Sequence, residues 1–157
     1  MNVVLIEPEI HFNTGNIGRT CVGAGAELHL VGRLGFSLDC AQIRRSGLDY
    51  WPKLRLRRHE DFASFLASMT EADPPLYFFS AEASKTYWEA DFHPGSYLVF
   101  GKESVGLAAE IREKYRDRTY RIPHSGRIRS LNLGTAAAVV LYEALRQTGR
   151  VGASGGG

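Results

Sequence analysis

The segment from residue 7 to residue 19 carries the side chains with the clearest chemical potential, Asn16 and Arg19, behind an apolar run at the N-terminus. Parallel α/β sheets bind ligands at the carboxyl ends of their strands, which is where this segment would lie. A helix that begins here offers free backbone N–H groups, and an arginine adds a forked cation, so the segment suits a phosphate. We expect Asn13 or Thr14 to cap that helix. The alternative is an ordinary helix cap with a surface arginine.

Two further segments repeat this arrangement of apolar run, turn and helix start. The first contains Gly101 and Gly106, and glycines allow a backbone to turn sharply and to approach a ligand closely. The second contains Ser130 and Asn132, either of which can cap the helix that follows. That helix is apolar on nearly all sides, which indicates burial on more than one face, either in a dimer interface or within its own domain.

The spacing of these residues excludes several familiar motifs. A phosphate-binding P-loop needs a glycine where Ser96 stands, and the segment Gly101–Gly106 is one residue too long for the nucleophile turn of serine hydrolases. The glycines after the first apolar run do not form a dinucleotide-binding fingerprint. The five histidines lack the spacing of metal ligands, so each is expected at the surface or in a loop, and no metal site is predicted. Cys21 and Cys40 are expected to be small buried hydrophobic side chains.

Short apolar runs alternate with helix-like stretches along the chain. This pattern predicts an α/β fold with a parallel sheet that is covered by helices on both faces, although it does not reveal the strand order. The predicted strands are residues 2–6, 27–31, 76–79, 97–100 and 119–122. The predicted helices lie near residues 16–25, 61–69, 108–115 and 132–148.

Length and composition describe an ordinary globular domain. The chain has 157 residues, of which 44% are hydrophobic and 23% are charged. We assign residues 1–150 to a single domain and the glycine-rich residues 151–157 to a flexible tail. Residues 32–52 show little periodicity, and loops of that length in compact domains are usually functional. We expect no membrane helix, signal peptide or disulfide framework, and hence a soluble cytoplasmic protein.

Basic residues gather in two stretches although the net charge is only +2. Residues 44–59 contain six Lys and Arg against one acid, and residues 112–129 contain seven against two. Such clusters are typical of surfaces that bind nucleic acid, because phosphate contacts release condensed counterions. On charge alone, a solvated charged surface is an equally good interpretation.

Together, the three segments resemble, in order and spacing, the signature motifs of the SPOUT-class RNA 2′-O-methyltransferases. Within this class the chain is similar to the enzymes that methylate the wobble cytidine or uridine of tRNA. The resemblance runs from Asn2 to about Gly149 and includes Gly35-Phe36 and Gly47-Leu48-Asp49-Tyr50. It implies an α/β domain with a C-terminal trefoil knot, S-adenosylmethionine as methyl donor and no metal. It also implies a homodimer that binds tRNA, and neither DNA nor a membrane.

The resemblance further implies roles for individual residues. Asn16 and Arg19 match the catalytic motif, and Tyr142 matches a family tyrosine on the last helix. The methyl donor would be bound by Phe79, Gly101, Ile122, Ser130, Leu131 and Asn132. The RNA substrate would be bound by Arg44, Arg45, Glu103, Arg127 and Arg129.

The attacking 2′-hydroxyl must lose its proton, and the resemblance assigns this step to Arg19. Guanidinium groups stay protonated in proteins, so our hypothesis is that Arg19 chiefly clamps the phosphate beside the target ribose. Tyr142 is a second candidate for the base.

Three positions depart from the family pattern. His11-Phe12 stands where Pro-Pro is common, Gly134 replaces a usual serine, and His124-Ser125-Gly126 replaces a proline-containing loop. These departures bear on substrate choice. Those at His11-Phe12 and Gly134 motivate one alternative, a catalytically silent RNA-binding protein of the same fold. A separate alternative is a 2′-O-methyltransferase of another RNA site.

Overall fold

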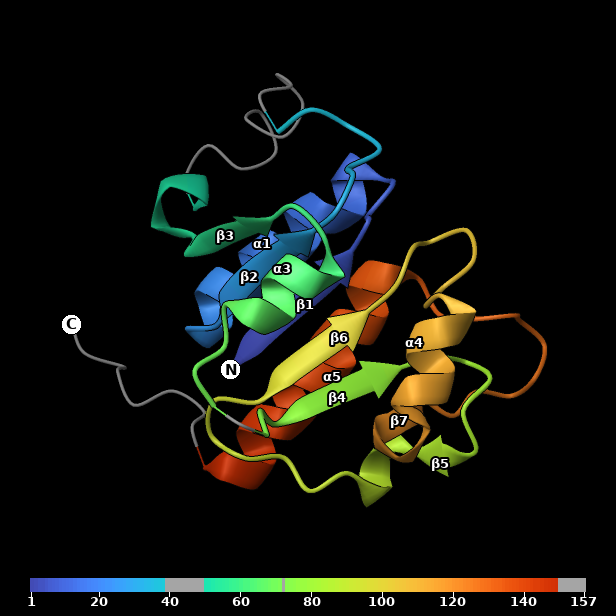
Figure 1. Ribbon diagram of the computed structural model, residues 1–157. Helices are drawn as coiled ribbons and strands as arrows, with labels where there is room; N and C mark the ends of the chain where they lie inside the picture. Colours follow the sequence, from blue (N-terminus) through green and yellow to red (C-terminus); the bar gives the residue numbers. More distant parts are fainter. Residues whose placement is uncertain (39–49, 72, 150–157) are drawn as a thin grey trace.

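The computed structural model describes residues 1–38, 50–71 and 73–149. In this part of the chain, seven strands form one parallel sheet in the order β3-β2-β1-β6-β4-β7-β5 (Figure 1). The parallel α/β sheet is confirmed, and so are the five predicted strands, the last of which is one residue shorter than predicted. The bounds are Asn2–Ile6 (β1), Glu27–Val31 (β2), Leu56–His59 (β3), Leu76–Phe79 (β4), Lys85–Thr86 (β5), Tyr97–Phe100 (β6) and Thr119–Arg121 (β7).

Helices cover both faces of this sheet, as predicted. The longer helices α1 and α5 lie together on one face, and the short helices α3 and α4 lie on the other (Figure 1). None of the helices in the described residues is long and apolar enough to cross a membrane. The α-helices are His11–Ala24 (α1), Phe62–Ala67 (α3), Ala109–Lys114 (α4) and Leu133–Thr148 (α5); short 3₁₀ turns are Trp51–Lys53 (η1), Tyr87–Glu89 (η2) and Arg116–Arg118 (η3).

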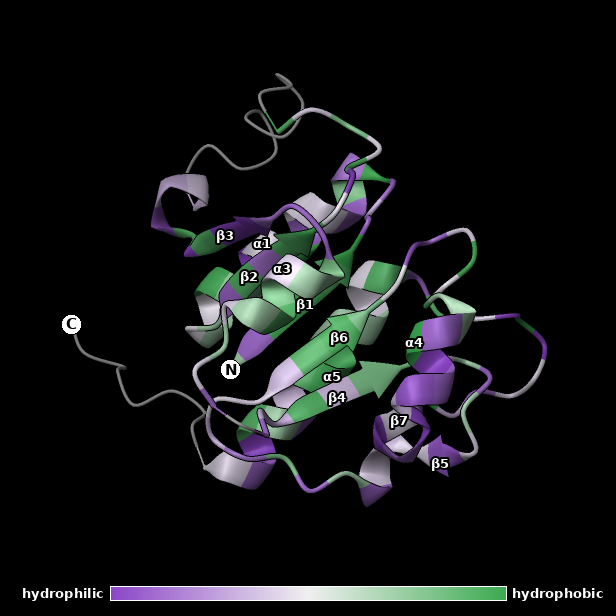
Figure 2. Ribbon diagram, viewed as in Figure 1, coloured by the Kyte–Doolittle hydropathy of each residue, from purple (hydrophilic) through white to green (hydrophobic). Residues whose placement is uncertain are grey.

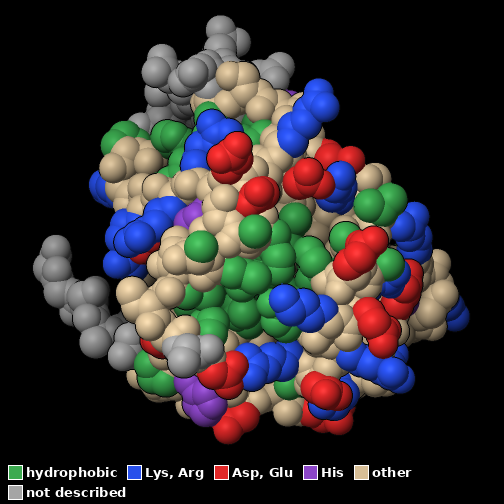
Figure 3. Space-filling view, viewed as in Figure 1, with side chains coloured by type: hydrophobic (Ala, Val, Ile, Leu, Met, Phe, Trp, Pro, Cys, Tyr) green, Lys and Arg blue, Asp and Glu red, His purple; other side chains and the backbone are tan. Residues whose placement is uncertain are grey.

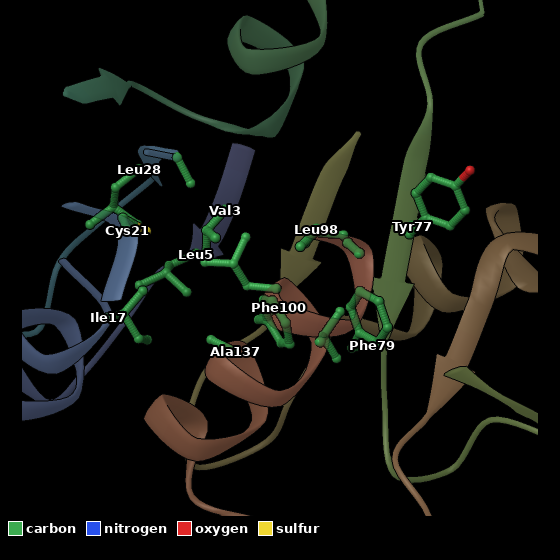
Figure 4. Packing of buried hydrophobic residues seen from close by; sticks show 14 of the residues in the cluster. Val3, Leu5, Ile17, Cys21, Leu28, Tyr77, Phe79, Leu98, Phe100 and Ala137 are labelled. Atoms are coloured by element: carbon green, nitrogen blue, oxygen red, sulfur yellow. The ribbon is translucent and has the colours of Figure 1, made fainter. Parts of the chain in front are cut away.

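Alternating strand side chains build two hydrophobic cores, one on each face of the sheet. Val3 and Leu5 of β1 point toward α1 and α5, whereas Val4 belongs to the core on the side of α3 and α4. All three are completely buried, and each such side chain stabilises the fold by roughly 1.5–3 kcal/mol. Figure 2 shows the central strands as a hydrophobic band, and Figure 4 shows Leu5 and Phe100 packed toward Ala137 of α5. Hydrophobic side chains also fill the space between α3 and α4, with charged side chains around them (Figure 3).

Two strands were not predicted, and both lie at an edge of the sheet. β3 reads Leu-Arg-Arg-His, a basic segment without an apolar run. Edge strands tolerate such charges because one side of the strand faces solvent, and here Arg57 forms an ion pair with Glu27 of the neighbouring β2. β5 contains only two residues, too few for any pattern.

Helix α1 begins at His11, five residues before the predicted start, and the predicted caps Asn13 and Thr14 are buried inside the helix. The N-cap residue is Ile10, whose side chain cannot cap. A carboxylate from a distant loop, that of Glu103, holds the entry to this helix, because it accepts the backbone N–H groups of the N-cap residue Ile10 and of Glu9 before it. By contrast, one of the two caps predicted for the last helix is confirmed: of Ser130 and Asn132, it is Asn132 that caps α5.

One histidine contradicts the expectation that all five lie at the surface or in loops. His29 is only 5% exposed on β2, with its Nδ1 3.0 Å from Nε2 of His59. Its ring meets the rings of Phe65 and Tyr97 edge-on, so it belongs to the core. Burial lowers the pKa of His29 to about 4, because the charged imidazolium loses its hydration there. Cys21 is completely buried, as predicted, whereas Cys40 lies outside the described residues.

The low pKa of His29 predicts that acid destabilises the protein well above pH 4. Between pH 7 and pH 5, His29 becomes protonated in the unfolded chain but stays neutral in the folded chain. The free energy of unfolding should therefore fall by about 2 kcal/mol because of this residue. Urea unfolding at both pH values measures this fall. His29→Leu should make it smaller, and His93→Gln, at an exposed position, serves as the mutational control. An equal fall in His29→Leu would contradict the assignment.

Candidate active site

A cavity of about 450 Å³ lies at the carboxyl edge of the sheet, where the loops after β4, β6 and β7 meet the start of α5. This volume is within the range of small-molecule sites in proteins. The residues predicted to bind the methyl donor all line this single cavity, although they come from three separate segments: Phe79, Gly101, Ile122, Ser130, Leu131 and Asn132.

The five residues predicted to bind RNA are divided by the structure. Glu103 and Arg129 line the cavity, and Arg127 is exposed on the same loop as Arg129 but does not line it. Arg44 and Arg45 lie outside the described residues. The carboxyl edge of the sheet therefore carries part of the predicted RNA-binding set beside the cavity.

The three residues predicted to be catalytic do not line the cavity. Asn16 and Arg19 are exposed on α1, where the Arg19 guanidinium lies 5.6 Å from the centre of the Tyr50 ring. Tyr142 of α5 is 47% exposed, and its hydroxyl lies 4.0 Å from the place that a Cβ on Gly23 would occupy. The predicted catalytic residues thus lie along the outer side of the α1–α5 pair.

The loop after β6 makes a tight turn that leaves no room for a side chain at Gly101. Lys102 and Gly106 exchange two backbone hydrogen bonds, of 3.1 and 2.8 Å. A Cβ on Gly101 would lie only 2.2 Å from the carbonyl carbon of Gly106, and Gly106 itself has a φ of 72°. Glycine is required at both positions for steric reasons, and the turn brings the backbone of this loop into the cavity wall.

Hydrogen bonds to the carboxylates of Glu103 and Glu9 hold the loops after β6 and β1 together, and we call this set of contacts the carboxylate clasp. The Glu103 carboxylate accepts the backbone N–H groups of Glu9 (2.7 Å) and Ile10 (3.2 Å) and an amide hydrogen of Asn13 (3.1 Å). In return, the backbone N–H and the hydroxyl of Ser104 both donate to the Glu9 carboxylate at 2.9 Å. These two hydrogen bonds lower the pKa of Glu9 below its usual range. The Glu103 carboxylate also lies at the positive end of the α1 dipole.

Asn13 connects the carboxylate clasp to the third segment, which contains Ser130 and Asn132 and leads into α5. Its side-chain oxygen accepts a hydrogen bond from the Asn132 amide at 2.9 Å, and the Asn132 oxygen in turn caps α5 through Gly134 N–H at 2.8 Å. Sequence reasoning treated Asn13 only as a possible cap and missed its place in the cavity wall. The sequence carried one signal for this place, since Asn13 is a polar residue in a helix with several apolar residues. The chain Glu103–Asn13–Asn132 therefore joins all three segments.

Glu7, the residue directly after β1, has a strained backbone. Its φ of 48° is the only positive value for a non-glycine residue in the described part of the chain. Its carboxylate lies 2.6 Å from the Lys102 ammonium, which lines the cavity, and this ion pair raises the pKa of Lys102. Strain of this kind persists where the surroundings hold a residue firmly, often beside functional sites.

The second basic stretch does not form one continuous surface. Arg118 precedes β7 at the amino edge of the sheet and binds Asp73 at 2.7 Å, whereas Arg129 lies at the opposite edge and donates to the Ser104 carbonyl at 2.8 Å. Arg112 forms an ion pair with Glu82. Some of the basic residues that the sequence predicted to bind RNA therefore form ion pairs or hydrogen bonds within the protein itself. Within the described residues, no three His, Cys, Asp or Glu side chains are placed to hold a metal ion.

Comparisons with known proteins agree with this geometry. The model of the SpoU rRNA Methylase family matches residues 1–142. The tRNA (cytidine(34)-2′-O)-methyltransferase of Burkholderia pseudomallei is 42% identical over 149 residues, which cover 94% of this chain and 96% of the relative. The enzyme of the same name from Saccharophagus degradans is 43% identical, with 96% and 97% covered.

Solved structures extend the likeness to the fold. A structure described as giving insights into the 2-OH methylation of C/U34 on tRNA superposes with a TM-score of 0.88 at 44% identity, covering 93% of this chain and 94% of the other. The SpoU methyltransferase AviRb of Streptomyces viridochromogenes, in complex with the cofactor AdoMet, has a TM-score of 0.81 at 25% identity, with 94% and 60% covered. With a family match over residues 1–142 and relatives similar along almost the whole chain, this protein belongs to the SpoU rRNA Methylase family.

Proposed function

We propose that this protein transfers a methyl group from S-adenosylmethionine to the 2′-hydroxyl of the wobble cytidine or uridine of tRNA. The observation that carries the proposal is that three motifs, far apart in the sequence, meet at one cavity. Relatives that match the chain over almost its whole length are named tRNA (cytidine(34)-2′-O)-methyltransferase. The tRNA substrate named for these relatives supports a cytoplasmic location.

The cavity suits the methyl donor in size and in chemistry. Phe79, Ile122 and Leu131 offer apolar surface for an adenine ring, and Ser130 and Asn132 offer polar groups beside it. S-adenosylmethionine would supply a methyl group on a sulfonium that leaves as a neutral thioether, a transfer for which no metal is needed. The C-terminal trefoil knot of the family would form around this cavity, between the loop after β6 and the start of α5.

We also propose that the functional unit is a homodimer. Asn16, Arg19 and Tyr142 lie on the outer side of the α1–α5 pair and outside the cavity of their own chain. In a dimer, this side of one copy can approach the cavity of its partner, with the target nucleotide between them. The separation of the two residue sets within one chain supports this arrangement.

In this arrangement Arg19 clamps the phosphate beside the target ribose. In the described residues no carboxylate forms an ion pair with Arg19, and its guanidinium is steadied by the Tyr50 ring, whose hydroxyl donates to the Gly15 carbonyl at 2.8 Å. An exposed and oriented guanidinium suits bidentate phosphate binding. Tyr142 remains the second candidate for the group that takes the proton.

Glu103, by contrast, acts on the substrate only through α1. Its carboxylate is occupied by Glu9, Ile10 and Asn13, so its place is that of a positioning residue. It holds the start of the helix that carries Asn16 and Arg19, and thereby sets where those side chains lie relative to the cavity.

The decisive experiment is transfer of labelled methyl groups to total tRNA from cells that lack this protein, followed by nuclease mapping of the product. We expect the label on a 2′-O-methylated wobble pyrimidine. Label at another tRNA position, or in ribosomal RNA offered in parallel, would keep the chemistry and discard the proposed site. Tight binding of S-adenosylmethionine without transfer to either RNA would favour a catalytically silent RNA-binding protein.

Arg19→Lys should lower kcat/KM for tRNA about 10- to 100-fold, because a lysine keeps the charge but cannot make two parallel hydrogen bonds to a phosphate. Steady-state kinetics with S-adenosylmethionine at saturation measure the loss. The affinity for S-adenosylmethionine, measured by calorimetry, should stay unchanged. Near-normal turnover of Arg19→Lys would rule out the bidentate clamp.

Glu103→Gln should lower both the melting temperature and kcat, with a smaller effect on KM for tRNA. The amide keeps one acceptor oxygen but loses the second acceptor and the negative charge at the start of α1, which costs roughly 1–3 kcal/mol. Glu110→Gln, on the exposed side of α4, is the matched control. A variant with wild-type melting behaviour and a raised KM for tRNA would instead make Glu103 a substrate-binding residue.

A further inference from the structure

Phe12 presents a large apolar ring to solvent beside the cavity. Its side chain is 59% exposed in the first turn of α1. The His11 ring lies against it, with ring centroids 4.2 Å apart at 35°, and Phe36 meets His11 edge-on at 6.4 Å. The same turn contributes Ile10 and Asn13 to the cavity lining. The exposed ring is therefore held in place from behind, on a turn that borders the cavity of its own chain.

Phe12 is also the first member of a stripe along α1. Asn16 and Arg19 follow at the fourth and seventh positions after it, so the three side chains share one face of the helix, and all three are exposed. The stripe presents a ring, an amide and a guanidinium in sequence over about 10 Å. The Arg19 charge has no acidic partner in the described residues, so the stripe is apolar at one end and cationic at the other.

This order of groups matches the chemistry of a single-stranded nucleotide. Unpaired bases stack on aromatic side chains, amides hydrogen-bond to base or ribose edges, and guanidinium groups bind phosphates. An apolar protein surface would leave the Asn16 amide and the Arg19 charge without partners. The charge and polarity of the stripe therefore favour RNA as its occupant.

We infer that Phe12, braced by His11 and Phe36, is a stacking platform for an unpaired nucleobase next to the methylated nucleotide. The inference rests on the proposed function and deepens it. Methyl transfer needs a ribose and the Arg19 clamp needs a phosphate, and every nucleotide has both. The Phe12 platform then adds a requirement for a neighbouring base that is free to leave its stack, as in a loop.

The test uses an RNA hairpin with the wobble cytidine in its loop and 2-aminopurine, whose fluorescence reports stacking, beside that cytidine. The full-length protein is compared with Phe12→Ala, Phe12→Leu and Phe12→Trp. Trp88→Ala is the matched control, because Trp88 is 65% exposed but lies next to the edge strand β5. The wild type, Phe12→Trp and Trp88→Ala should quench the fluorescence.

Phe12→Ala and Phe12→Leu should lose the quenching and weaken hairpin binding about 5- to 100-fold, as expected for the loss of one base–aromatic stack. With tRNA as substrate, the same two variants should raise KM by a similar factor and leave kcat and S-adenosylmethionine affinity near the wild-type values.

Wild-type quenching and affinity in Phe12→Leu would overturn the inference. So would Phe12→Ala forming monomers, in sedimentation, under conditions where the wild type dimerises, since Phe12 would then be an interface residue. Failure of the wild type to methylate tRNA would refute the proposed function alone, because the binding and quenching measurements decide about the platform without turnover.

Discussion

A single carboxylate, that of Glu103, holds together the parts from which the site is built. It accepts the backbone N–H groups of Glu9 and Ile10, directly before α1, where its own negative charge and the helix dipole favour each other. Through Asn13 the same carboxylate is linked to the cap of α5. The cavity wall, the helix α1 and the first turn of α5 thus share one hydrogen-bonded chain.

Local patterns predicted the fold well wherever they depended on burial. The strands β1, β2, β4 and β6 were predicted to the residue, because each is a short and mainly apolar run. The start of α1 was predicted five residues late, because the carboxylate that holds the residues before it belongs to Glu103, about 90 residues further along the chain. The prediction that His29 lies at the surface or in a loop was wrong for a related reason. Its partner in the fold, His59, is 30 residues away in the sequence, so no local pattern indicates the contact.

In the candidate site too, local features were predicted and contacts between distant residues were not. The loop segments that would hold the methyl donor were found as motifs, since turns and glycines are local features, and the structure brings them to one cavity. Which partner each charge would have could not be predicted. Arg112 and Arg118 were counted toward an RNA surface, yet Glu82 and Asp73 bind them within the fold. Asn13 shows the opposite error, since a residue assigned to a local cap connects two distant segments.

The order of the strands determines when the site can exist during synthesis. β1 lies between β2 and β6, so its second neighbour emerges from the ribosome only after some 90 further residues. Until then one edge of β1 has no partner and the start of α1 has no carboxylate. Loop closure over such separations makes folding slow compared with proteins built on local contacts. A nascent chain therefore cannot complete the cavity until most of it has been translated, and until then β1 keeps an unpaired edge.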